Sequence, residues 1–182
     1  MSLGKKEIVR AGLALLNEVG LDGLSTRKLA LVLSVQGPAL YHHFQNKHEL
    51  LGYMSNALIS EALDGLDPRQ GWEEWLRRSA ISIRAVVLSY RDGARLLTTA
   101  WPDDDMRHKT IPMLVSPLLR AGFAMSDAQE AIVIMSSFSI GWMMNEQNHS
   151  LNALMASQMN IDAAYVRALD AIILGLRVRL PG

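Results

Sequence analysis

The sequence predicts an all-α protein with a small N-terminal group of short helices and a larger helical body. Apolar residues recur at spacings of three and four along most of the 182 residues, which is the pattern of amphipathic helices. No stretch alternates apolar and polar residues as a strand does. Glycine, proline and capping residues divide the N-terminal quarter into short segments, so we expect short helices there and longer ones beyond.

The composition is that of a folded protein without thiol chemistry. Hydrophobic residues make up 49% of the chain and charged residues 20%, which supports a packed core. The sequence has no cysteine, so disulfides, thiolate metal ligands and cysteine nucleophiles are excluded. The first residues lead into an amphipathic pattern rather than the apolar stretch of a signal peptide, and we therefore expect a cytoplasmic protein.

Charge is divided unevenly along the chain, although the net charge is zero. Residues 1–47 carry six Lys or Arg and three Asp or Glu, whereas the remaining residues carry twelve and fifteen. A basic head on an acidic body suits a protein whose head binds nucleic acid. A chance distribution of solvated charges explains these small numbers equally well.

Caps and stops predict four helices in the first 63 residues. The first helix ends at Gly20, because glycine is a common C-terminal stop, and Ser25 caps the second. Pro38 lies in the first turn of the third, where its missing N–H costs nothing. Asn46 and Glu49 resemble a capping box that opens the fourth. The expected ranges are about 8–19, 25–33, 37–43 and 47–63.

The rest of the sequence predicts a helical body. Pro112 and Pro117 remove backbone donors, so the segment 104–121 is expected to be a kinked or broken helix. Ser126 and Gln129 form another capping box before a strongly apolar helix. The other expected elements are a long helix over 72–90, a short helix between Asp92 and Pro102, a further helix after residue 150 and a last helix over 162–179.

Two short helices joined by a tight turn are typical of a helix-turn-helix, which places its second helix in the DNA major groove. Arg27 suits guanine, Gln36 suits adenine and Ala39 suits a thymine methyl group. Lys28 and Lys47 suit phosphate oxygens. An ordinary solvated face explains these residues equally well. The candidate DNA-binding residues are Thr26, Arg27, Lys28, Gln36, Gly37, Pro38, Ala39, Tyr41, His42 and Lys47.

Two runs of residues in this region are distinctive, LDGLSTRKLA over 21–30 and SVQGPALYHHFQNKHELL over 34–51. They closely resemble the DNA-binding signature of the tetracycline repressor family. A weaker likeness continues through the body, so that the resemblance covers the whole chain. It is carried there by Trp72, the run SYRDGAR over 89–95, Pro102, Gly122, Phe123 and Gly141.

The resemblance implies a homodimeric repressor of double-stranded operator DNA. Residues 1–47 would form the helix-turn-helix domain, with a linker helix over about 47–63, and residues 64–182 the effector-binding and dimerisation domain. In that family two C-terminal helices of each subunit form the dimer interface, which implies about 127–147 and 162–179 here. Burial within one chain explains their apolar faces equally well. An effector in the body would shift the linker helix and release a palindromic operator.

The family's tetracycline–magnesium chelate is not the effector that this sequence implies. Leu63, Leu97 and Ala100 stand at positions of the family's polar ligands, and leucine offers neither a metal ligand nor a hydrogen bond. We expect a small, largely apolar effector and neither cofactor nor metal, while core packing is the plain alternative for each residue. The candidate pocket residues are Leu63, Ser79, Ile83, Leu97, Ala100, Trp101, Met113, Leu114, Met135 and Phe138.

Metal and catalytic interpretations have little support. Asp103, Asp104 and Asp105 precede His108, but acidic residues before a helix are more often caps. The sequence has no nucleophile elbow, zinc-protease motif or phosphate-binding glycine loop, so we expect no enzyme. Two alternatives to a repressor stay open, a helical small-molecule binding protein without operator binding and a helical enzyme. The effector of a repressor can act as inducer or as corepressor.

Overall fold

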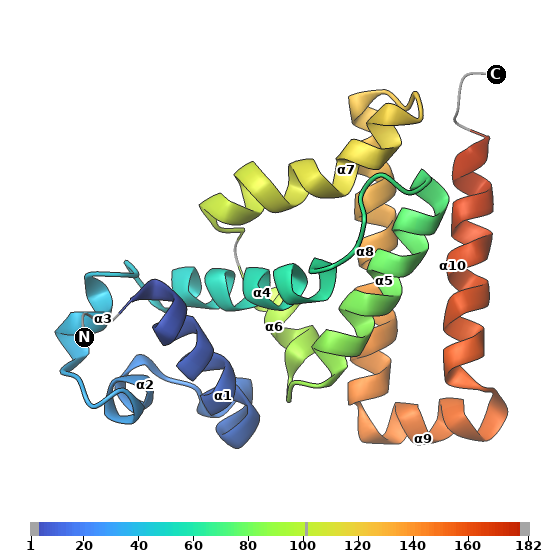
Figure 1. Ribbon diagram of the computed structural model, residues 1–182. Helices are drawn as coiled ribbons and strands as arrows, with labels where there is room; N and C mark the ends of the chain where they lie inside the picture. The colour runs from blue at the N-terminus through green and yellow to red at the C-terminus, as the bar shows by residue number, and fades with distance from the viewer. Residues whose placement is uncertain (1–3, 101, 179–182) are drawn as a thin grey trace.

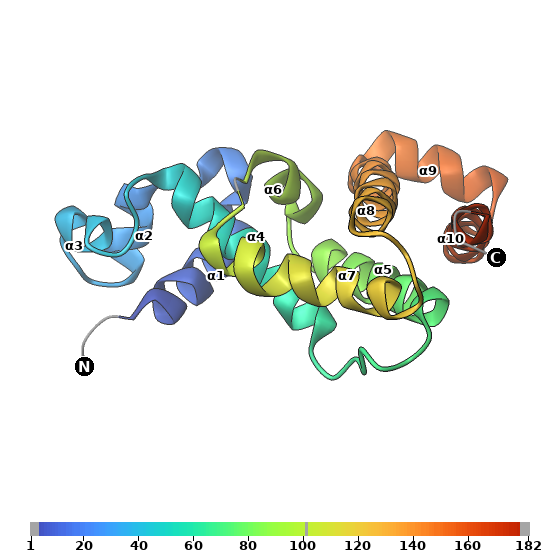
Figure 2. The same ribbon diagram turned by 90° about the horizontal axis from the view of Figure 1, so that it is seen from above.

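The computed structural model describes residues 4–100 and 102–178, and this part of the chain is helical without any strand, as predicted. None of its helices is long and apolar enough to cross a membrane. The short N-terminal helices lie at one end and α10 at the other (Figures 1 and 2). The elements are α1 (Lys5–Gly23), α2 (Thr26–Val32), α3 (Gly37–Tyr41), α4 (Lys47–Leu63), α5 (Trp72–Leu88), α6 (Gly93–Thr99), the π-helical turn η1 (Met106–Thr110), α7 (Ile111–Arg120), α8 (Met125–Gln147), α9 (His149–Gln158) and α10 (Ile161–Arg177).

The helices of the head begin at the predicted caps. The Ser25 hydroxyl accepts the N–H of Lys28 at 3.2 Å, and Asn46 Oδ1 accepts the N–H of Glu49 at 2.9 Å. The Glu49 carboxylate accepts the N–H of Gln45 at 2.5 Å, so the return bond reaches one residue beyond that of a standard capping box. These side chains satisfy N–H groups that a helix start leaves without partners.

Helix α4 is shared by two apolar cores. The first core contains the buried faces of α1, α2 and α3, includes Leu58 of α4, and continues to Val87 and Met143 in the body. The second core contains Trp75 of α5 and Leu63 at the end of α4. In Figure 1, α4 runs from the head into the middle of the molecule. A displacement of α4 therefore disturbs the packing of both parts.

The end of α1 is docked to the turn between α5 and α6. Asp92 Oδ2 accepts the N–H of Leu21 at 2.8 Å, and the Arg95 guanidinium lies 2.8 Å from the Asp22 carboxylate. Gln147 of α8 hydrogen-bonds to the backbone on both sides of Asp92. The head is thus attached to the body at a second place besides α4.

The segment with two prolines is irregular, as predicted. Met106–Thr110 form a π-helical turn, which the N–H of Ile111 closes by donating to the Met106 carbonyl. Pro112 lies in the first turn of α7, and Pro117 lies inside that helix. A π-helical turn changes the direction of side chains relative to a regular helix, so the prolines are accommodated without ending the segment.

The predicted capping box at Ser126 and Gln129 is wrong. Helix α8 begins at Met125, and its N-cap is Ala124, which has no capping side chain. The physical reason is tertiary packing, because Phe123 is buried with its ring centroid 5.0 Å from that of Trp72. This contact fixes the chain directly before α8. The helix therefore begins at Met125, before the Ser126 cap that the sequence predicts.

Replacement of Gly20 by alanine should destabilise the protein. Gly20 interrupts α1 with φ 70° and ψ 174°, and an added Cβ would lie 2.8 Å from Asp92 Oδ2. We expect Gly20→Ala to lower the free energy of unfolding in urea by about 1–3 kcal/mol. The control Gly71→Ala, at φ −55° with open space around it, should change it by less than about 0.5 kcal/mol. Equal losses in the two variants would contradict this account.

Candidate DNA-binding face and effector cavity

The candidate DNA-binding residues lie on the two short helices α2 and α3 and at the start of α4, at the end of the molecule far from α10 (Figure 1). The hydroxyls of Thr26 and Tyr41 are 3.5 Å apart, which connects α2 to α3. The turn between these helices contains Ser34 at φ 54°. Arg27, Lys28, Gln36, Pro38, Tyr41 and His42 are exposed, and Thr26, Gly37, Ala39 and Lys47 are half-buried.

Helix α3 is fixed on the core of the head by Leu40 and Phe44, which are buried. His42 is exposed, while His43 is half-buried with its ring centroid 6.5 Å from that of Phe44. Lys47 lies in the first turn of α4, where free N–H groups and the helix dipole favour an anion such as phosphate. The head therefore combines an anchored short helix with neighbouring cations.

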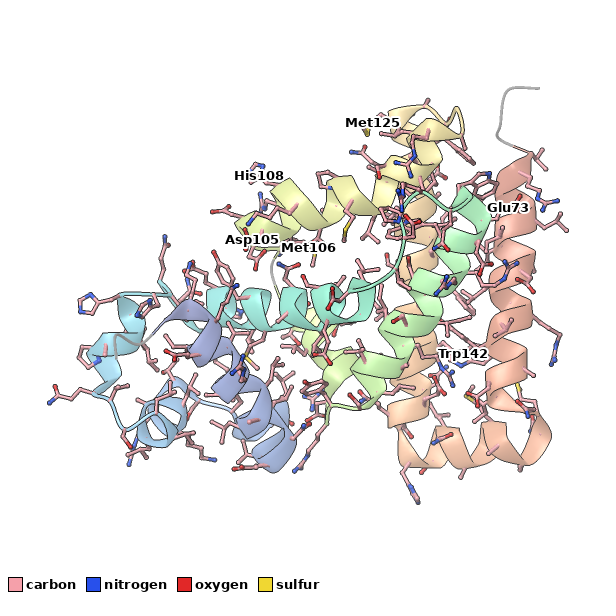
Figure 3. The ribbon with its side chains drawn as sticks, viewed as in Figure 1. Glu73, Asp105, Met106, His108, Met125 and Trp142 are labelled. Atoms are coloured by element: carbon pink, nitrogen blue, oxygen red, sulfur yellow. The ribbon has the colours of Figure 1, made fainter. Side chains whose placement is uncertain are left out.

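The body holds a cavity of about 310 Å³ between α4, α5, α6, α8 and the η1–α7 segment. Met106 of η1 lines this cavity and lies on the side of its segment that faces α4 (Figure 3). Small residues of α4, Gly52 and Ser55, line it from the opposite side. Six of the candidate pocket residues also line it, namely Ser79, Ile83, Leu97, Ala100, Leu114 and Met135.

Other candidate pocket residues lie elsewhere. Leu63 and Met113 line a separate depression between α4 and α7. Phe138 stacks on Tyr165, with the ring centroids 5.7 Å apart and the planes at 12°. Trp101 lies outside the described residues. Most of the cavity lining thus comes from α5 and α8, and the end of α4 does not contribute to it.

The cavity has lining residues that sequence reasoning missed. They include Trp75 on α5 and Ile132, Ser139 and Met143 on α8. Those on α8 stand at three, four and eight residues from Met135, which is the spacing of one helix face. Helical periodicity starting from the residues already chosen would have found them.

A buried carboxylate lies next to the cavity, where the helical segment leading into α7 begins. Asp103 Oδ1 accepts the N–H of Met106 at 2.5 Å, which confirms the predicted capping role. The Thr110 hydroxyl donates to Asn56 Oδ1 at 2.9 Å and joins η1 to α4. Burial raises the pKa of Asp103. Within residues 4–100 and 102–178, no group of three acidic or histidine side chains could hold a metal ion.

The helices α5, α8 and α10 are connected by polar and aromatic contacts. Arg84 of α5 binds Glu146 of α8 through two hydrogen bonds of 2.5 and 2.8 Å. Trp142 lies between α8 and α10 (Figure 3). These helices also expose apolar residues, since Val133 of α8 is 60% exposed and Leu174 of α10 is 62% exposed. Exposed apolar residues on paired helices are typical of a surface that binds another chain.

A helix-turn-helix head on a body with an apolar cavity defines a DNA-binding regulator that carries a small-molecule site. Two family models match the chain. The model described as "Bacterial regulatory proteins, tetR family" matches residues 8–54, and the one described as "Tetracyclin repressor-like, C-terminal domain" matches residues 64–168. The chain belongs to the tetR family of bacterial regulatory proteins.

Relatives with known roles are transcription regulators. The tetracycline repressor protein class A from transposon 1721 of Escherichia coli is 42% identical over 142 residues, which are 77% of this chain and 65% of that protein. A TetR variant from Acinetobacter baumannii AYE in complex with minocycline is 36% identical, with a TM-score of 0.81 over 98% of this chain and 99% of that one. BioQ with its double-stranded DNA operator is 26% identical, with a TM-score of 0.74 over 96% and 98%.

The raised pKa of Asp103 predicts a pH-dependent stability that asparagine should remove. A carboxyl whose pKa is higher in the folded state stabilises the fold below its unfolded pKa, about 4, and this contribution is lost as the pH rises through the folded-state pKa. Asp103→Asn can still cap the helix but cannot ionise. Relative to wild type, its free energy of unfolding should therefore increase across this pH range.

Urea titrations of wild type and Asp103→Asn from pH 4 to pH 8 measure this difference. Asp103→Ala should be about 1 kcal/mol less stable than Asp103→Asn at all of these pH values, because neither variant ionises there and only the cap differs. Asp104 is exposed, so Asp104→Asn is the matched control and should follow the wild-type curve. A difference between wild type and Asp103→Asn that stays constant with pH would contradict the burial of the charge.

Proposed function

We propose that the protein is a homodimeric repressor that leaves its operator when a small, largely apolar effector binds. Residues 1–47 are the proposed DNA-binding domain, α4 the linker helix, and residues 64–182 the effector-binding and dimerisation domain. The double role of α4 supports this best. Lys47 at its start belongs to the candidate DNA-binding face, and Gly52 and Ser55 one and two turns later line the cavity. An effector therefore contacts the helix that carries the head.

In this proposal α3 enters the major groove and α2 lies across the phosphate backbone. Arg27 reads a guanine, Gln36 an adenine and Ala39 a thymine methyl group. Lys28 and Lys47 bind phosphates and fix the position of the head. The structural likeness to BioQ, a protein solved with its double-stranded DNA operator, supports this assignment.

The proposed dimer forms through α8 and α10 of each chain. Both helices expose apolar residues, of which Val133 and Leu174 are the most exposed on each. A two-fold axis through this contact presents two copies of α3, and a palindromic operator matches that symmetry. Membership of the tetR family supports a dimer of this kind.

The proposed effector differs from the drugs named for the relatives. Those relatives are called tetracycline repressors, and one is bound to minocycline. In this chain no charged side chain occurs among the cavity-lining residues that the structure describes. Leu97 and Ala100 offer no metal ligand, so we propose an effector that needs neither a metal ion nor a cofactor.

The proposed coupling is a displacement of α4 when the effector fills the cavity. Differential affinity for the two positions of α4 shifts the population away from the form that fits successive major grooves. Leu97 and Ala100 on and after α6 also line the cavity, and α6 follows the turn that holds the end of α1. A second path from cavity to head therefore runs through Asp92.

We propose no catalytic activity and a place in the cytoplasm, where the operator lies. The cavity offers serine hydroxyls but no imidazole or carboxylate among its described lining residues, and a serine nucleophile needs an adjacent base. The family match supports regulation rather than turnover.

Selection of bound sequences from a random DNA pool tests the proposed function. We expect a palindrome for wild type, with affinity that falls as salt rises because phosphate contacts release counterions. Arg27→Ala should relax recognition at one base pair per half-site and cost about 1–3 kcal/mol. Arg69→Ala, an equal charge change in the loop between α4 and α5, should leave the selected sequence unchanged.

No enriched sequence from a folded dimer would contradict the proposal unless added effector restores it. Restoration by effector would reverse the sign of the coupling and make the effector a corepressor. Failure in both conditions would favour the alternative, a helical small-molecule binding protein that does not bind operator DNA.

A further inference from the structure

The polar groups of the cavity are few and uncharged. Its described lining residues are apolar except for four serines, Ser55, Ser79, Ser136 and Ser139. The indole N–H of Trp75 is already used, because it donates to the Leu114 carbonyl at 3.0 Å. A charged ligand buried here would lose its hydration without gaining a partner of opposite charge. The walls therefore suit a neutral molecule.

Ser79 is the cavity serine whose hydroxyl is buried without a hydrogen bond. The residue is 4% exposed, and none of the residues that the structure describes offers its Oγ a hydrogen-bond partner. By contrast, the Ser136 hydroxyl donates to the Val133 carbonyl at 3.0 Å, and Ser139 Oγ is 2.8 Å from the Tyr165 hydroxyl. Helical serines usually bond to a carbonyl of the preceding turn, but Ser79 does not.

An unpaired buried hydroxyl is unfavourable, and a ligand that supplies a partner removes this cost. Ser79 lies on α5, a helix fixed in the second core by Trp75 and Leu76, so its position is set before a ligand arrives. Ser79 lines the cavity, so rotation about its Cα–Cβ bond turns the unpaired hydroxyl toward a ligand that fills it.

We propose that the cavity binds a compact, uncharged, aromatic or alicyclic compound with one hydroxyl or carbonyl group, which pairs with the Ser79 hydroxyl and needs no metal ion. This inference rests on the proposed function, since it names the chemical class of the effector. The volume of about 310 Å³ lies at the lower end for small-molecule sites, which sets the compact size. The absence of charge from the described walls sets the neutrality, and the unpaired Ser79 hydroxyl sets the polar group of the ligand.

The test compares two probes that differ in one hydroxyl group, 1-naphthol and naphthalene, by equilibrium dialysis against the full chain. Wild type should bind both. Ser79→Ala should weaken binding of 1-naphthol about tenfold, the worth of one buried hydrogen bond, and should leave naphthalene binding unchanged or slightly tighter. Ser136→Ala is the matched control, because Ser136 lines the same cavity and already has a partner. It should change neither affinity.

Three results would overturn the proposal. Ser79→Ala could affect both probes equally, Ser136→Ala could lose as much 1-naphthol binding as Ser79→Ala does, or wild type could bind neither probe. Tight binding of a tetracycline–Mg²⁺ chelate with no binding of 1-naphthol would overturn it too. Urea midpoints of the variants check that each is folded.

Operator affinity measured without probe separates this inference from the proposed function. Loss of operator binding in every protein, with the probe difference intact, would contradict the regulator and leave the cavity chemistry standing. Operator binding without any difference between the two probes in Ser79→Ala would contradict the cavity chemistry and leave the regulator standing.

Discussion

Burial of α4 on nearly every side is the constraint on which the rest of the structure depends. A helix that is apolar around most of its circumference has to lie between other elements, and α4 lies between the core of the head and that of the body. Leu58 packs in the first core and Leu63 in the second. Between them and Lys47, the small residues Gly52 and Ser55 leave space that larger side chains would fill. The cavity and the attachment of the head thus have one origin.

A second attachment keeps the head from turning freely about α4. Asp92 adopts φ 57° and accepts the N–H of Leu21, while Gln147 holds the same turn from α8. Gly20 gives α1 the break that brings Leu21 to this carboxylate. Two attachments define an orientation, whereas one defines only a hinge. Since α6 follows Asp92 and lines the cavity, both attachments are in contact with the place where an effector would lie.

The starts of α2, α3 and α4 could be predicted because their signals are local. Ser25, Pro38 and Asn46 each act through their own turn of backbone, and each does so in the structure. The start of α8 could not be predicted, because the contact of Phe123 with a distant tryptophan overrides the local cap. Only some of the cavity-lining residues could be predicted, because tertiary contacts also decide which residues face the cavity. Helical periodicity identifies the residues that share a helix face, but it does not identify what that face packs against. Phe138 packs on Tyr165 of α10 and not against the cavity, and this contact is tertiary.

An uncharged cavity limits how an effector can act. Without ion pairs, affinity comes from buried apolar surface, and roughly 200 Å² of it gives about 5 kcal/mol before the cost of association. Only the difference in affinity between two positions of α4 shifts the equilibrium. Gly52 and Ser55 form one wall of the cavity, so this wall moves with α4. A ligand that fits the wall better in one position of α4 than in the other therefore binds the two positions with different affinities. The effect of an effector is therefore decided by its shape against α4, and the hydroxyl of Ser79 decides its orientation.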